Sequence, residues 1–569
     1  MMKNRYLTKI FPKVQPKNAR KTESWKQVAR TIQKHDKNLT EEKRELSQNK
    51  EYDTIIKEKT TGVTGMVTTV QSAGLYGVDG YLVTVECEMA SGLPAFDLVG
   101  LPGMAVRESR ERVRAAARAC GLPLAPSHIT VNLAPADIKK EGAVYDLPIL
   151  LGLLHAQDSC PAVPEDCVCI GELSLAGDLR PVKGALSMAM AARDAGMTSM
   201  ILPAENAVEA ALAGDITIYA AENLKQILSH LNGRERIAPF CLSETETEED
   251  GSQLDFSEVL GQENVKRAME IAAAGGHNIL LSGSPGSGKS MMAKRIGTIL
   301  PPMTEEEKSE VVRIYSAIGE GIRAVRRKAR PVRAPHHTTS PVGLVGGGTG
   351  IPKPGEVSLA HNGVLFLDEL PEFSKEALEI LRQPIEDGEV SIVRAAGRVR
   401  YPANFMLVCA MNPCKCGWYG HPSGRCRCTM QEVARYRKRI SGPLLDRIDI
   451  QVDVQPVELE SLVGRRAGEP SDVILQRVIA ARERQRLRYE GTAIRCNADM
   501  QSSQLAQYAQ PDEAGQALLN AAFERMGMTA RSYDRILRVA RTIADLDGAD
   551  TISAMHIAEA IQYRFPENT

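Results

Sequence analysis

The chain has 569 residues, a formal net charge of −1, and 43% hydrophobic and 25% charged residues. One hydrophobic core cannot organise that length, so several domains are expected, and the balanced charge argues neither for nor against nucleic acid as a partner. The sequence lacks the roughly 18 to 20 apolar residues of a membrane span and the apolar part of a signal peptide. We therefore predict a cytoplasmic protein without a membrane segment, and the twelve cysteines, mostly single in apolar segments, fit a reducing compartment.

Residues 1–65 are rich in Lys, Asn, Gln and Thr and poor in large apolar side chains. Such a segment cannot bury enough surface to fold alone, which predicts a basic, disordered extension. A misassigned start upstream of Met66 explains the same composition, so we assign the segment no function.

Residues 66–235 combine short β-branched runs, at 81–85 and 129–133, with helical patterns at 106–119 and 147–154. Alternation of these two periodicities predicts a compact α/β domain. The charge run that follows it predicts an acidic linker over residues 236–255.

Residues 256–460 begin with a helical pattern, an apolar strand at 278–282, a glycine-rich turn and a helix that opens at Lys289. Further strands at 364–367 and 405–410 alternate with helices, which predicts a parallel sheet covered on both faces. Beyond about residue 456 the pattern is helical, so residues 461–569 are expected to form an all-α domain. Its clearest apolar stripe has the spacing i, i+3, i+4, i+7: Ile536, Val539, Ala540 and Ile543.

The glycine-rich turn matches the phosphate-binding pattern G-x-x-x-x-G-K-[ST]. In such a loop backbone N–H groups and the helix N-terminus face the phosphates, Lys289 reaches the β- and γ-phosphates, and Ser290 ligates Mg²⁺. The cofactors predicted are therefore ATP and Mg²⁺. The candidate binding residues are Gly283, Ser284, Pro285, Gly286, Ser287, Gly288, Lys289 and Ser290.

Two carboxylates end the apolar run at 364–367. We expect Asp368 to hold the Mg²⁺ and Glu369 to polarise the attacking water. Asn412, at the end of the next strand, is placed to orient that water. An asparagine after a strand is usually a turn residue, so its assignment depends on the neighbouring motifs.

Arg447 lies between Asp446 and Asp449 after a turn. In a ring ATPase an arginine here can reach the γ-phosphate bound by the next subunit. The alternative is an intrachain salt bridge to Asp446 or Asp449.

From about Met66 the chain resembles the ComM/YifB family of magnesium-chelatase-like AAA+ ATPases. Besides the motifs above, the resemblance rests on Tyr-Gly-Val-Asp-Gly at 76–80, Asn-Leu-Ala-Pro-Ala-Asp at 132–137, Ala-Pro-His-His-Thr at 334–338 and His-Asn-Gly at 361–363. It implies a domain similar to Lon proteases and ribosomal protein S5, a chelatase-type AAA+ core and a helical C-terminal lid. It also implies a ring of identical subunits, expected to be a hexamer.

Within this resemblance Arg447 matches the arginine finger, and Arg531 matches the sensor-2 arginine of the lid. Peptidase activity is not expected, because residues 142–146 read Gly-Ala-Val-Tyr-Asp where Lon proteases carry the nucleophile. Leu186 stands where the catalytic lysine falls. The Lon-like domain is therefore interpreted as a module that binds a protein partner or supports assembly.

Residues 389–401 alternate around a turn of small residues, which predicts a β-hairpin carrying Arg394, Arg398 and Arg400. It is similar to the pre-sensor hairpin of MCM-type helicases, where Arg394 takes the place of a DNA-contacting lysine. These arginines are candidate phosphate contacts inside a ring, and a solvated basic hairpin is the alternative.

Cys414, Cys416, Cys426 and Cys428 bracket a glycine-rich loop, so four thiolates can surround one structural Zn²⁺. One residue, rather than the usual two, separates each pair, and free thiols are the alternative. His336 and His337 are adjacent and are interpreted as loop residues near the nucleotide.

The sequence thus predicts an ATP-driven ring motor acting on DNA, with a helicase or branch-migration role in recombination and natural transformation (competence). A chelatase-type ATPase that remodels a protein partner for metal insertion is the main alternative, and a nucleotide-switched scaffold is a third.

Overall fold

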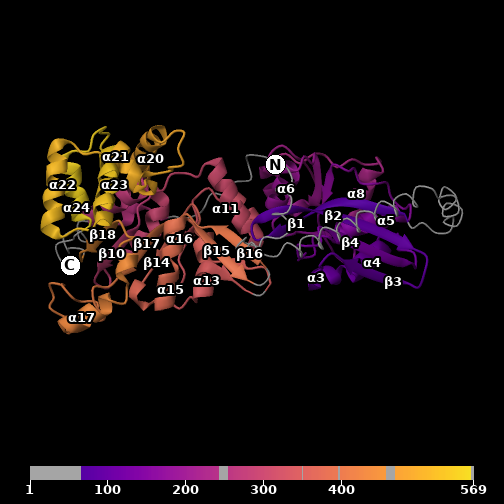
Figure 1. Ribbon diagram of the computed structural model, residues 1–569, viewed down its shortest axis with the longest axis horizontal. Coiled ribbons are helices and arrows are strands. Elements are labelled where there is room, and N and C mark those ends of the chain that lie inside the picture. The colour runs from indigo at the N-terminus through magenta and orange to yellow at the C-terminus, as the bar shows by residue number, and fades with distance from the viewer. Residues whose placement is uncertain (1–65, 243–253, 349, 395–396, 457–467, 565–569) are drawn as a thin grey trace, which may run out of the picture. The chain divides into compact units, whose positions relative to one another are not determined.

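A computed structural model (Figure 1) describes residues 66–242, 254–348, 350–394, 397–456 and 468–564. The predicted extension 1–65 and most of the predicted acidic linker lie outside these residues. Within them, no helix combines the length and apolar character that crossing a membrane requires.

The N-terminal part contains a seven-stranded sheet in the order β3-β4-β2-β1-β5-β8-β9. β1 and β2 are antiparallel, whereas β3 pairs with β4, and β1 with β5, in parallel. The strands are β1 (Val67–Tyr76), β2 (Asp79–Ala90), β3 (Ala95–Val99), β4 (His128–Ala134), β5 (Cys167–Cys169), β8 (Ser199–Pro203) and β9 (Thr217–Ala221), with a separate pair β6 (Glu172–Leu173) and β7 (Leu179–Arg180).

The helices of this part are α3 (Met104–Arg107), α4 (Ser109–Ala119), α5 (Asp146–Ala156), α6 (Ala185–Asp194), α7 (Ala207–Ala210) and α8 (Leu224–Leu231). α5 is buried along Asp146–Leu154, because it is apolar on all sides. The helix predicted at 106–119 is divided at Glu108, whose backbone keeps right-handed helical angles. The predicted α/β character of this part is therefore observed.

A second sheet, with five strands that are all parallel, has the order β11-β14-β17-β10-β18. Its strands are β11 (Val332–Arg333), β14 (Val364–Leu367), β17 (Met406–Met411), β10 (Ile279–Gly283) and β18 (Ile450–Val454). Every residue of β14 and β17 is buried, as expected for strands covered on both faces. The three strands predicted here agree within one or two residues, and β11 is too short to show a period in the sequence.

The helices that accompany this sheet are α9 (Glu263–Gly275), α10 (Lys289–Arg295), α11 (Glu305–Ile318), α12 (Gly321–Arg326), α13 (Pro341–Val345), α14 (Glu356–Leu359), α15 (Lys375–Ile380), α16 (Arg382–Asp387), α17 (Met430–Arg437) and α18 (Gly442–Leu445). The predicted hairpin is β15 (Glu389–Arg394) with β16 (Gly397–Pro402), which pair in antiparallel fashion. A second small pair joins β12 (Gly346–Gly347) to β13 (Lys353–Pro354).

The C-terminal part is helical, as predicted: α20 (Ser471–Arg488), α21 (Ser502–Tyr508), α22 (Glu513–Met526), α23 (Ala530–Leu546) and α24 (Ala554–Gln562). The predicted stripe of α23 is buried to within 1% exposure at all four positions. It shares one apolar cluster with α9, β10, β17 and α20, so these helices pack on the five-stranded sheet (Figure 1).

Candidate functional site

The glycine-rich turn lies between β10, which pairs with β17 and β18, and α10, which begins at Lys289. Gly286 and Gly288 have positive φ angles of 79° and 93°, which side chains rarely adopt. The turn thereby brings successive N–H groups to the N-terminus of α10, at the carboxyl edge of a parallel sheet. Anionic groups are stabilised at such an edge.

The Lys289 ammonium is held inside this turn. It donates to the carbonyls of Gly283 (2.7 Å) and Ser284 (2.8 Å), and Lys289 is only 8% exposed. Burial lowers the pKa of Lys289, and the charge of Asp368 acts in the opposite direction. A buried ammonium with a carboxylate nearby is well placed to receive further negative charge.

The carboxylates predicted after β14 lie beside the turn. The Ser290 hydroxyl donates to Asp368 Oδ2 at 2.6 Å, across 78 residues of sequence. The Glu369 N–H donates to Asp368 Oδ1 at 2.9 Å, while Glu369 itself adopts a left-handed backbone with φ 52°. A left-handed conformation in a glutamate is uncommon, and strained backbone of this kind is concentrated at functional sites.

Asn412 follows β17, the strand between β14 and β10. Its Oδ1 accepts a hydrogen bond from Lys289 Nζ at 3.3 Å. The structure therefore brings Lys289, Ser290, Asp368 and Asn412 together, because the strands that carry them end at one edge of the sheet.

His337, interpreted from the sequence only as a loop residue near the nucleotide, contacts the carboxyl group of Glu369. Its Nδ1 lies 3.1 Å from Glu369 Oε2, and its ring packs edge-on against Phe373 with the centroids 6.5 Å apart. His337 comes four residues after β11, which pairs with β14. Because β11 has only two residues, the sequence does not predict it, and the position of His337 next to β14 could not be predicted either. The adjacent His336 contacts Thr338 instead, at 2.9 Å.

Arg447 takes part in an ion pair, although with a different partner from the two considered above. Its guanidinium contacts Glu386 of α16 and donates to the carbonyl of Pro443 at 2.6 Å. Asp446 instead pairs with Arg564 at 3.3 Å, and Asp449 with His277 at 3.4 Å. Arg447 is 7% exposed, so this pair shields it from water.

Besides Arg447, the charge of Arg531, the second arginine assigned from the sequence, affects the pKa of Glu386. The hydrogen bond from Arg447 lowers the pKa of Glu386 most, and the positive charge of Arg531 contributes further. Arg531 is exposed in the first turn of α23. Two arginines that sequence analysis assigned separately thus act on one carboxylate.

The three arginines of the hairpin are all exposed. Arg398 and Arg400 pair across the ladder with Val393 and Ser391, opposite the face on which Val390, Ile392, Val399 and Tyr401 are buried. Arg394 pairs with Gly397 at the end of the hairpin and therefore belongs to the other face. The predicted basic patch consequently has two arginines on one face and one at the end.

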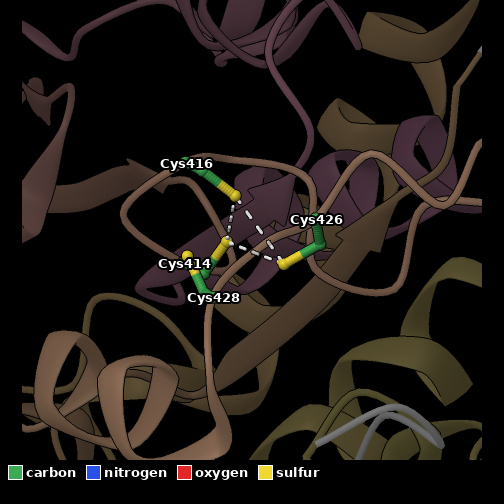
Figure 2. A group of neighbouring side chains, drawn as sticks. All are labelled: Cys414, Cys416, Cys426 and Cys428. Carbon is green, nitrogen blue, oxygen red and sulfur yellow. Dashed lines mark hydrogen bonds between the residues drawn. The ribbon is translucent and has the colours of Figure 1, made fainter.

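The four cysteines converge, as the loop between β17 and α17 folds back on itself (Figure 2). Cys414 Sγ lies 3.3 Å from Cys416 Sγ and 3.9 Å from Cys426 Sγ, and Cys416 Sγ lies 3.7 Å from Cys426 Sγ. All four sulfur atoms lie within 4.8 Å of one another. Such a group offers ligands of a kind that soft metal ions prefer.

The strand order, the glycine-rich turn and the acidic pair after β14 are consistent with an AAA+ chelatase-like fold. Residues 255–462 match the family model described as magnesium chelatase, subunit ChlI, and residues 468–564 match its C-terminal counterpart. Residues 85–206 match the model described as subunit ChlI of Mg-chelatase. The class is therefore that of the magnesium-chelatase-type proteins.

Similar proteins narrow this assignment. The chain is 42% identical over 501 residues to the competence protein ComM of Haemophilus influenzae, an alignment covering 87% of this chain and 97% of ComM. It is 41% identical over 502 residues to the uncharacterized protein YifB of Salmonella typhimurium, covering 87% and 96% respectively. The magnesium-chelatase subunit ChlI of Guillardia theta is 28% identical over 185 residues, covering 28% of this chain and 51% of that protein. The chain belongs to the ComM/YifB family.

Proposed function

We propose that this chain binds and hydrolyses ATP in a ring of identical subunits, expected to be a hexamer, and uses the energy to act on DNA. The observation that carries the proposal is the convergence of Lys289, Ser290 and Asp368 at the glycine-rich turn, with Asn412 beside them. Family membership supports it, because chelatase-type AAA+ proteins use ATP and Mg²⁺.

In this proposal the residues of the turn, Gly283 to Ser290, hold the triphosphate, and Lys289 exchanges its carbonyl partners for phosphate oxygens. Ser290 and Asp368 are adjacent oxygen donors of the kind that Mg²⁺ requires. Mg²⁺ would neutralise charge on the phosphates when bound there.

Glu369 acts as the base and Asn412 orients the water. As the water oxygen bonds to the γ-phosphorus, Glu369 accepts a water proton and ADP leaves with the electrons of the broken P–O bond. Glu369 directly follows Asp368, to which its N–H donates, so the proposed base is adjacent in the chain to the proposed Mg²⁺ ligand.

Arg447 serves as the arginine finger for the adjoining subunit, and Arg531 as the sensor-2 arginine of the lid. Supporting this role, both arginines act on Glu386, so a single carboxylate balances the two guanidinium groups until a phosphate replaces it.

DNA is proposed as the substrate because Arg398 and Arg400 lie on the same exposed face of the hairpin, two residues apart on β16. Regularly spaced guanidinium groups bind phosphates with little dependence on base sequence. A relative named competence protein supports a role in DNA uptake or recombination, including helicase or branch-migration activity.

The experiment is ATP turnover of the full chain with no DNA, single-stranded DNA and forked DNA. We expect DNA to stimulate turnover, and Arg398→Ala with Arg400→Ala to abolish the stimulation while leaving basal turnover unchanged. Arg323→Ala with Arg327→Ala, on or next to α12 outside the hairpin, is the matched control. Equal turnover under all three conditions would contradict the DNA proposal.

The second candidate is a chelatase-type ATPase that remodels a protein partner for metal insertion, and the matches to magnesium chelatase support it. In either case we propose the domain divisions 66–235, 256–460 and 461–569, with the first as a Lon/S5-like, non-proteolytic module that binds a partner. Turnover stimulated by a protein fraction and insensitive to both DNA and the hairpin variants would favour this candidate.

A further inference from the structure

The loop between Asn412 and α17 has little to hold it in place by itself. Residues 413–429 contain no helix or strand, and most of their side chains are polar or glycine. Trp418 packs against His421 with ring centroids 4.9 Å apart, and Arg425 stacks over Trp418 at 5.1 Å. These contacts are near the surface and contribute little stability each.

Three of the four sulfur atoms have separations close to those of a tetrahedral metal site, and the sulfur of Cys428 lies within 4.8 Å of each of them. A tetrahedron with Zn–S bonds of about 2.3 Å has edges of about 3.8 Å, and the measured sulfur separations are 3.3, 3.7 and 3.9 Å. Figure 2 shows the sulfur atoms of Cys414, Cys416 and Cys426 turned toward one another, with Cys428 beside Cys414. Cys414 is fully buried, so the site has an inner anchor as well as an accessible side.

The same loop touches the glycine-rich turn. Gly417 is buried with φ +84°, and a Cβ added to it would lie 2.6 Å from Cγ of Pro285. Cys414 also comes two residues after Asn412, which accepts a hydrogen bond from Lys289. A metal that fixes Cys414 and Cys416 therefore fixes the segment between Asn412 and the contact with Pro285.

We propose that Cys414, Cys416, Cys426 and Cys428 bind one Zn²⁺, and that the zinc-bound loop supports the glycine-rich turn through the contact of Gly417 with Pro285. The second half rests on the proposed nucleotide site, whereas the first half does not. Four thiolates in a tetrahedron favour zinc or an iron–sulfur cluster over magnesium or calcium, and a structural site with four protein ligands is closed to substrate.

Metal analysis of the purified full-length protein tests the first half. We expect about one zinc per chain, lost in Cys416→Ser with Cys426→Ser and retained in the control Cys120→Ser with Cys241→Ser, whose thiols lie outside the group. Wild-type protein without zinc, with iron in its place, or with four freely reacting thiols at these positions would overturn the assignment.

A single tryptophan reports on the loop without relying on activity. The chain has two tryptophans, so Trp25→Phe leaves Trp418 alone. Removing zinc with a chelator should shift the Trp418 emission while the far-ultraviolet circular dichroism stays unchanged. An unchanged emission after complete zinc removal would show that the loop does not need the metal, which overturns the supporting role.

Two glycine substitutions test the support of the turn. Gly417 and Gly420 both have positive φ angles, +84° and +76°, but only Gly417 is close to Pro285, since nothing lies within 4 Å of a Cβ added to Gly420. Gly417→Ala should weaken ATP binding roughly tenfold, equivalent to about 1.4 kcal/mol, whereas Gly420→Ala should not. Equal affinities, with zinc retained in both, would overturn the coupling, and a wild type that binds no ATP would instead refute the proposed function.

A different observation concerns the Glu369 carboxyl group. His337 Nδ1 lies 3.1 Å from Glu369 Oε2, which is within ion-pair distance. The ring is kept in place by Phe373 on one side and by His336, with centroids 4.1 Å apart, on the other. These contacts place the His337 ring next to the Oε2 atom of the Glu369 carboxyl group.

The geometry points to His337 as a positioning residue for Glu369, an inference that rests on the proposed hydrolysis. His337→Ala should lower kcat roughly tenfold without changing ATP affinity, and His337→Asn, which keeps a donor, should recover part of it. His128→Ala, which breaks an exposed pair with Asp97, is the matched control and should leave kcat unchanged. Wild-type kcat in His337→Ala beside an inactive Glu369→Gln would refute the positioning role alone, and activity in both variants would refute the hydrolysis.

Discussion

Two groups of charged residues differ in whether a single chain completes them. The phosphate half is the glycine-rich turn with its neighbouring polar side chains, and the arginine half is Arg447 with its partner Glu386. Around the glycine-rich turn, Lys289, Ser290, Asp368 and Asn412 already contact one another. Arg447, by contrast, is engaged with Glu386 and is 7% exposed. Under the proposed function, the comparison teaches that binding and hydrolysis make different demands. A single chain holds the groups proposed for binding, whereas the proposed role of Arg447 in hydrolysis requires this arginine to leave Glu386.

The largest expected effect is on the phosphate half. Lys289→Ala should weaken ATP binding by about 100-fold or more and remove turnover, because it deletes a buried ammonium for which the neighbouring carbonyls cannot substitute. Isothermal titration with ATP and Mg²⁺ measures it. Lys294→Ala, an exposed position on the same helix, should bind normally, and tight binding by Lys289→Ala would remove the basis of the comparison.

On the arginine half, Arg447→Ala should leave ATP affinity unchanged but lower turnover about 10³-fold, the lower end of what such arginines contribute. Mixing it with wild-type subunits should inhibit them if the arginine acts on a neighbour. Arg439→Ala, which breaks a surface pair with Glu372, is the control. Loss of binding together with turnover in Arg447→Ala would mean that the arginine serves its own site.

The third prediction concerns the carboxyl group of Glu369, the proposed base. Glu369→Gln should bind ATP as the wild type does and hydrolyse it roughly 10²- to 10⁴-fold more slowly, because the amide cannot accept the water proton. Single-turnover measurement of phosphate release separates this step from binding. The control is Glu372→Gln, three residues further along the chain, which is expected to remain active. Sustained hydrolysis by Glu369→Gln would mean that another residue is the base.

The smallest expected effect is on the free energy of unfolding, and it concerns the ionised carboxyl group of Asp449. Burial by itself raises the pKa of Asp449, yet the hydrogen bond from His277 and the charge of Arg535 lower it to about 2. A lowered folded pKa stabilises the protein above the unfolded pKa, near 3.8, and this stability disappears as pH falls through about 2. The contribution is about 2 kcal/mol, so unfolding free energies of wild type and Asp449→Asn, measured from pH 5 to 2, should converge at low pH. A constant difference would contradict this.

Much of the phosphate half could be predicted from the sequence because its signals are local. The strand, the turn and the start of α10 are contiguous, and the ends of parallel strands place Asp368 and Asn412 at the same edge without knowledge of any side-chain contact. The hairpin was also predicted from its alternating pattern, although neither its register nor the face that Arg394 occupies was predicted.

The partners of Arg447 and Glu369 could not be predicted in this way. Glu386 is 61 residues from Arg447 and lies on α16, a helix of six residues in which one more glutamate carries no signal. His337 depends on β11, whose two residues show no periodicity. Pairs of this kind are set by the three-dimensional path of the chain, and only the structure reveals them.

The contact between Glu386 and Arg447 has a thermodynamic consequence for assembly. If a triphosphate on the next subunit competes with Glu386 for this guanidinium, then nucleotide occupancy and subunit association are linked functions, and each must favour the other to the same extent. Removing the competitor, as in Glu386→Gln, should then lower the ATP concentration at which rings form, even though Glu386 is placed outside the phosphate site.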